Sequence, residues 1–276
     1  MKIINTINEI DICFENGMFS KSGWDTYMDK VYPAAKKLVE ADSASYHFER
    51  DILPVVNMVC ANKDKLRLLN ESFKKITDKI EEKIADTVGT TIDADIVLYL
   101  GLCNGAGWAT KVENRSVVLL GIEKIIELGW TDELSMIGLV YHELGHLWHF
   151  QNRTVRTEIK TPVDGALWQL YSEGIAMYFE QMLCGDAHFY HQDKNGWLNW
   201  CMDNRKRLFD EYLRRIDAGE SVQDFFGDWC SFEGKSDVGY YLGAELICDA
   251  LKAYSRNEVL NLSVDDVKDI LINCAK

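Results

Sequence analysis

Hydrophobic residues recur at intervals of three and four through most of the chain, with charged residues between them. Before residue 90 this pattern runs through Leu66, Leu69, Phe73, Ile76, Ile80 and Ile84. It predicts amphipathic helix packed on a domain core, with a coiled coil or partner helix as the alternative. After residue 185 a second stripe predicts a further helix, and two last helices are expected at about 240–256 and 264–275. That second stripe consists of Trp197, Cys201, Leu208 and Tyr212.

Two apolar segments in the middle of the chain have a different pattern. Residues 95–102 (DIVLYLGL) and 116–122 (SVVLLGI) are rich in Val, Ile and Leu and predict strands. Residues 103–108 (CNGAGW) contain two glycines and predict a hairpin loop between them. The expected fold class is therefore α+β and mainly α-helical, with a small sheet ahead of the next helix.

That next helix carries the sequence HELGH, with His142, Glu143 and His146. Residues four apart in a helix differ by about 40° in direction and about 6 Å in height. The two imidazoles therefore point the same way and can bind one metal ion, with Glu143 beside it. A core histidine that satisfies its own hydrogen bonds is the alternative for either ring alone. Two rings at this spacing, with a glutamate between them, favour a metal site.

The surrounding segment has the features of a helix. Thr131 is expected to cap it, and Asp132 and Glu133 place negative charge in its first turn. One apolar stripe is expected to face the core, with the two histidines on its flank. The stripe consists of Leu134, Ile137, Tyr141, Leu144 and Trp148.

Glu173 is the candidate for a third ligand. Residues 153–162 are polar and predict a loop, after which a helix is expected from about 165 to 184. Asp164 is expected to cap this helix, with Gly185 just beyond its end. Most neighbours of Glu173 are apolar, which is unusual for a solvated face, although a surface carboxylate is the alternative.

Gly174 follows the candidate ligand directly. Glycine in mid-helix costs about 1 kcal/mol relative to alanine, so a packing reason is expected. We expect this glycine to let its helix approach the HELGH helix closely.

The combination of HELGH with Glu173, Gly174 and Ala176 (EGxA) resembles the gluzincin branch of zinc metallopeptidases, which includes thermolysin-like proteases and membrane-alanyl-type aminopeptidases. It is more closely similar to a group of predicted zinc-dependent proteases that add a later GYxxG, here residues 239–243. The resemblance covers residues 90–276 and, more weakly, the N-terminal part. It implies a zincin-like metallopeptidase domain that binds one Zn²⁺ per chain through His142, His146 and Glu173.

The same resemblance implies roles for other groups. Tyr240, or Tyr241 next to it, would stabilise the oxyanion, with a core aromatic as the alternative for either. The strand before the HELGH helix, or residues 104–108, would present its backbone edge to an extended substrate.

Two positions and one segment depart from related patterns. Asn152 stands where metzincins have a third histidine, which excludes that branch. Met177 stands where thermolysin-like enzymes have an aspartate, so another acceptor must orient the imidazoles. Residues 111–114 (KVEN) match the amine-binding segment of the aminopeptidases poorly, so exopeptidase specificity is not supported.

The expected activity is zinc-dependent hydrolysis of peptides or of a flexible protein segment. Zinc lowers the pKa of its bound water to about 7, and Glu143 would act as general base and then protonate the leaving amine. A single-residue aminopeptidase is one alternative, and a zinc-stabilised binding or regulatory protein without turnover is another. The presence of Glu143 favours an enzyme, because a structural site needs no base.

Composition limits the setting. The chain has 276 residues, 47% of them hydrophobic, and is expected to form one domain with a helical part (1–90), the sheet and ligand helices (91–184) and a second helical part (185–276). No apolar run approaches the 18 residues of a membrane span, and the N-terminus lacks the features of a signal peptide. A net charge of −14 argues against nucleic acid as a partner. The sequence contains no pattern that specifies an oligomeric state.

The cysteines, the basic residues after position 200 and three further histidines are expected to have structural roles. The eight cysteines include no CxxC pair and are expected to be reduced, mostly buried thiols in a cytoplasmic protein. The basic residues at 205–207 and 214–215 are expected to form a solvated face, with binding of a substrate carboxylate as the alternative. His149, His188 and His191 are expected not to be ligands.

Overall fold

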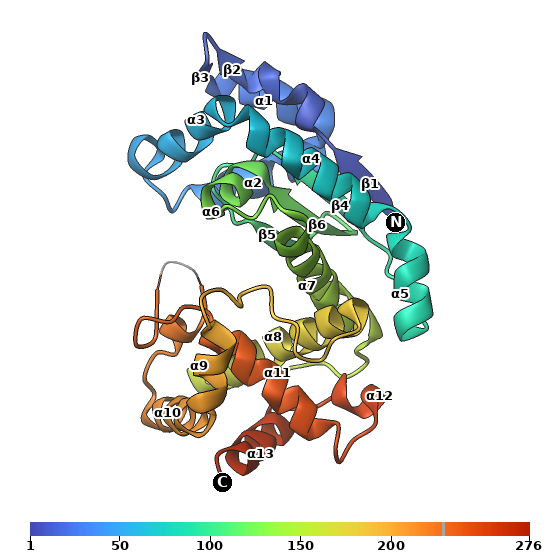
Figure 1. The fold of residues 1–276 in the computed structure, drawn as a ribbon, viewed down its shortest axis with the longest axis vertical. Helices are drawn as coiled ribbons and strands as arrows, with labels where there is room; N and C mark the ends of the chain where they lie inside the picture. The colour runs from blue at the N-terminus through green and yellow to red at the C-terminus, as the bar shows by residue number, and fades with distance from the viewer. Residues whose placement is uncertain (228–229) are drawn as a thin grey trace. The chain divides into compact units, whose positions relative to one another are not determined.

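A computed structural model describes residues 1–227 and 230–276. It confirms a mainly helical α+β chain with a small mixed sheet (Figure 1). The chain falls into two compact units, Met1–Glu143 and Leu144–Lys276, whose boundary lies inside helix α7 (Glu133–Asn152). A single domain divided near residues 90 and 184 stays a prediction.

The first unit contains a four-stranded sheet in the order β1-β4-β6-β5. Strand β4 (Asp95–Tyr99) lies parallel to β1 (Lys2–Asn5) and to β6 (Arg115–Gly121), whereas β5 (Gly107–Val112) is antiparallel to β6. Strands therefore form within the predicted segments 95–102 and 116–122. The prediction that a hairpin loop joins them is wrong. They are parallel neighbours, and the chain forms β5 at the edge before it returns as β6.

Helices and a second, two-stranded sheet complete the first unit. Lys79 adopts a left-handed backbone with a φ of 56° and separates α4 from α5. The predicted apolar stripe is buried on both sides of this break, from Leu69 to Ile84. This confirms helices packed on a core. The elements are β2 (Phe14–Glu15), β3 (Met18–Phe19), α1 (Lys21–Val31), α2 (Lys36–Ser43), α3 (Leu53–Ala61), α4 (Lys63–Thr77), α5 (Ile80–Val88) and α6 (Ile122–Leu128).

Helix α8 (Pro162–Cys184) is the longest helix that the structure describes in the second unit. It starts three residues earlier than predicted, because Thr161 caps it and Asp164 completes a capping box instead of being the cap. Its C-terminus is as predicted, with Gly185 in a left-handed conformation. The other helices of this unit are α9 (Trp197–Asp203), α10 (Arg205–Ala218), α11 (Val238–Ala250), α12 (Arg256–Val259) and α13 (Val264–Cys274).

Two glycines bring the backbones of α8 and α11 into contact. A Cβ on Gly174 would lie 2.3 Å from the carbonyl oxygen of Gly243, and a Cβ on Gly243 would lie 2.7 Å from the nitrogen of Gly174. Gly174 therefore serves the packing of α11, and the expectation that it serves the HELGH helix is wrong. That approach depends on Gly145, whose Cβ would lie 2.8 Å from the Cα of Ala176.

Polar side chains of the second unit bind the backbone of residues 259–262, which connect α12 to α13. Arg153 donates hydrogen bonds to the carbonyl oxygens of Leu260 (2.9 Å) and Leu262 (2.8 Å). The hydroxyl of Tyr171 donates to the carbonyl of Val259 at 2.6 Å, and the buried His149 ring lies 3.2 Å from the same hydroxyl.

His149 is expected to make the protein less stable in acid. Burial and the neighbouring charge of Arg153 lower the pKa of His149 from 6.5 to about 3. Between these values the unfolded chain binds a proton that the folded chain does not, so the free energy of unfolding falls as the pH drops below 6.5. We expect His149→Gln to remove about 2 kcal/mol of the loss between pH 6.5 and pH 5. Urea unfolding in the presence of a chelator measures the free energy of unfolding at each pH. If this free energy fell equally with pH in the native chain and in His149→Gln, the prediction would be contradicted.

Candidate metal centre

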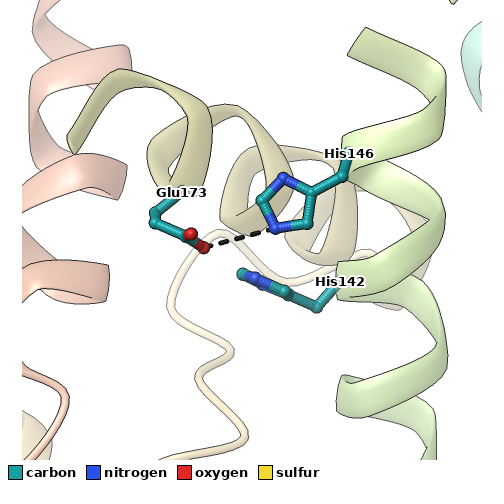
Figure 2. Close-up of side chains that lie close together, drawn as sticks. All are labelled: His142, His146 and Glu173. Atoms are coloured by element: carbon teal, nitrogen blue, oxygen red, sulfur yellow. Dashed lines mark ion pairs between the residues drawn. The ribbon is translucent and has the colours of Figure 1, made fainter. Parts of the chain in front are cut away.

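Two imidazoles and one carboxylate lie together on α7 and α8 (Figure 2). One ligand atom from each of His142, His146 and Glu173 lies within 4.8 Å of the other two. His142 is buried, and the other two side chains are half-buried. Within residues 1–227 and 230–276, no other group of three or more His, Cys, Asp or Glu side chains meets this criterion.

Helix α7 places the two histidines one turn apart, as the sequence predicts, but its start differs. The cap is Asp132, whose carboxylate accepts hydrogen bonds from the amide (3.0 Å) and hydroxyl (2.8 Å) of Ser135. The expected cap, Thr131, is wrong by one residue. Leu134, expected in the core, is 62% exposed, because the helix buries a different set of residues in its first two turns. That set is Met136, Leu139 and Val140.

Glu173 points from α8 toward the histidines of α7, and Figure 2 marks its ion pair with His146. The carboxylate Oε2 lies 3.3 Å from Nε2 of His146. Neighbouring ligand atoms around a tetrahedral ion bound at about 2.05 Å are about 3.3 Å apart. The existing spacing of these two groups therefore suits a shared ion. Two imidazoles and one carboxylate also form the ligand set of zinc sites that keep a fourth position for water.

The second nitrogen of His146 has a partner that sequence reasoning missed. Nδ1 of this ring lies 3.4 Å from the hydroxyl of Ser172, which directly precedes Glu173 on α8. A hydroxyl at this position can accept a hydrogen bond from the Nδ1–H group, which leaves Nε2 directed toward Glu173. The only sequence signal was the position of this serine next to the predicted ligand.

Glu143 is held by the sheet of the first unit. Its side chain is 9% exposed, and its Oε2 accepts a hydrogen bond of 2.7 Å from the backbone amide of Ala109 in β5. The carboxylate is not a member of the three-ligand group. This position, one residue after His142, is compatible with a role as base.

The two tyrosines of the GYxxG segment have different environments on α11. Tyr241 is 2% exposed, its ring lies 6.0 Å from that of Tyr190, and burial raises the pKa of its hydroxyl. Tyr240 is half-buried, with its ring 6.5 Å from His191 and 5.9 Å from Phe226. Tyr241 is therefore a core aromatic, whereas Tyr240 is the more exposed of the two.

The other histidines have separate partners. Nδ1 of His191 lies 2.9 Å and 3.0 Å from the two carboxylate oxygens of the fully buried Glu180. His149 packs against Tyr171, and the backbone amide of His188 donates to Asp186. None of these rings belongs to the three-residue group.

The basic residues of α10 form ion pairs within the chain. Arg205 pairs with Glu245 and Asp249, and Arg214 pairs with Glu211 and Glu220. These pairs favour a solvated face over binding of a substrate carboxylate. The eight cysteines are present as thiols and not as disulfides: three are buried, four half-buried and one exposed.

No protein family, no curated protein and no solved structure matches this chain. In the part of the chain that the structure describes, no helix is long and apolar enough to cross a membrane. The metallopeptidase interpretation therefore depends on the motifs and on the geometry of the three-residue group.

Proposed function

We propose that this chain is a zinc-dependent peptidase of the gluzincin type, with a zincin-like arrangement around HELGH. The observation that carries the proposal is the convergence of His142, His146 and Glu173 within 4.8 Å, with Glu143 as the next residue after the first ligand. We assign the metal as one Zn²⁺ per chain. Cysteines that are thiols and not disulfides suit a reducing compartment, and we propose a cytoplasmic location.

Each side chain of the site has a separate role in the proposed hydrolysis of a peptide bond. When bound, zinc lowers the pKa of its water to about 7 and polarises the scissile carbonyl. Glu143 accepts the proton of the attacking water and passes it to the leaving amine. Tyr240 donates a hydrogen bond to the oxyanion. Ser172 fixes the orientation of His146.

We assign recognition of an extended substrate to strand β5. In the sheet built by the described residues, β6 is paired on both sides, whereas β5 lies at the edge. The strand directly before the HELGH helix, β6, therefore has no open edge, and we assign the role expected of it to β5. A peptide or a flexible protein segment can add to such an edge through backbone hydrogen bonds.

Metal analysis and peptide cleavage test the proposal together. The purified chain is expected to hold one zinc and to cleave peptides with blocked amino termini, to lose cleavage with a chelator and to regain it with zinc. Cleavage of peptides with free amino termini alone would identify an aminopeptidase. Zinc without cleavage would support the non-catalytic alternative, and a chain that binds no stoichiometric metal would refute the metal centre.

A further inference from the structure

Gly107, the first residue of β5, lies directly against the side chain of Glu143. A Cβ built on Gly107 would lie 2.6 Å from Oε1 and 2.7 Å from Cγ of Glu143, and 2.8 Å from a methyl carbon of Leu139. All three are side-chain atoms. An alanine at this position would therefore displace the carboxylate and the leucine methyl before it displaced any backbone.

The backbone of Gly107 does not itself require glycine. Its φ lies outside the left-handed range that side chains rarely adopt. The requirement for a residue without a side chain comes from the space that Glu143 occupies.

The amide of Ala109 is directed away from the sheet. The amide of Gly121 donates to the carbonyl of Ala106 at 3.0 Å, which makes 106 and 121 a hydrogen-bonded pair of the β5–β6 ladder. Such pairs alternate along antiparallel strands, so Ala109, which faces Val118, directs its N–H to the outer edge. There it donates to Oε2 of Glu143 at 2.7 Å.

We propose that Gly107 and the amide of Ala109 form a cradle that fixes the orientation of the catalytic base. The amide donates a hydrogen bond to Oε2, and the absence of a side chain on Gly107 leaves the space that Oε1 occupies. Because Oε2 already accepts this hydrogen bond, Oε1 is the oxygen that accepts the proton of the attacking water. Gly107 is a positioning residue, because it acts through Glu143. This inference rests on the proposed function, in which Glu143 is the base.

The contact is tested first without any measurement of activity. In the full chain as purified, the amide proton of Ala109 is expected downfield in the NMR spectrum, because it donates to a carboxylate. Glu143→Ala is expected to move this resonance upfield, and Gly107→Ala is expected to shift it as well. Gly165→Ala is the control, because the nearest atom to its new Cβ is a methyl carbon of Ile159 at 3.8 Å. An Ala109 resonance that does not respond to Glu143→Ala overturns the cradle.

Kinetics test the positioning role. Gly107→Ala is expected to keep one zinc and the native thermal midpoint, and to lower kcat about 100-fold with little change in KM, because small misplacements of a catalytic group have effects of this size. In a Glu143→Asp background the shorter side chain leaves room at residue 107, so the same substitution is expected to lower kcat less than about threefold.

Three results would overturn the inference: native kcat in Gly107→Ala, an equal loss in both backgrounds, or failure of Gly107→Ala to fold. Absence of peptide hydrolysis by the native chain would refute the proposed function instead, and the Ala109 resonance would still decide whether the contact exists.

Discussion

Replacement of Glu143 by glutamine is expected to leave one zinc per chain and to lower kcat for peptide hydrolysis by about 10²- to 10⁴-fold, the range contributed by a general base. Glutamine has almost the same size as glutamate, and its oxygen can still accept the hydrogen bond of Ala109. It cannot accept a proton from water at neutral pH. Metal analysis with steady-state kinetics on one blocked peptide measures both results.

Glu133→Gln is the matched control on the same helix. Glu133 lies in the first turn of α7, with its side chain 44% exposed, and pairs with Lys75 at 2.6 Å. Exposed ion pairs contribute little to stability, so this variant is expected to keep native activity. Full activity of Glu143→Gln would remove the proposed base. Loss of zinc from that variant would show that Glu143 belongs to the ligand set.

The local features of the site were predictable because each depends on one helix. The spacing of His142 and His146 determines their common direction whatever surrounds them. Glu173 was predictable because a charged residue in an apolar helix needs a partner. In the structure these three side chains lie together on α7 and α8.

The sheet was less predictable because its pairing is not local. Strand β1 has only four residues and pairs with β4, more than 90 positions later, so no local pattern indicated it. The two strong apolar segments were found, but their parallel pairing depends on β5, whose half-exposed residues gave a weak signal.

Packing partners were also beyond the sequence. The pattern showed that Gly174 needed a close neighbour but did not identify α11. In the first two turns of α7, several faces carry apolar residues, so periodicity placed Leu134 in the core, although it is exposed. Ser172 was missed because a serine beside a ligand is recognised only by its distance to the imidazole.

Gly243→Ala is expected to lower the free energy of unfolding by about 3 kcal/mol, at the upper end of the usual range for overpacking. The new Cβ would lie 2.7 Å from the nitrogen of Gly174 and 2.7 Å from the carbonyl oxygen of Leu170. These are backbone atoms of a helix, so no change of rotamer can relieve the overlap, and α8 and α11 must separate. Urea unfolding followed by circular dichroism measures the loss.

The same substitution links helix packing to the proposed metal site, because Glu173 is next to the crossing on α8. We expect Gly243→Ala to weaken zinc binding as well, although residue 243 is not a ligand. Gly165→Ala is the control on α8, since its Cβ would meet only a methyl carbon of Ile159 at 3.8 Å. Because alanine favours helix over glycine, the control is expected to be as stable as the native chain or up to about 1 kcal/mol more stable. Native stability and zinc affinity in Gly243→Ala would show that the backbones of α8 and α11 do not meet at this glycine pair.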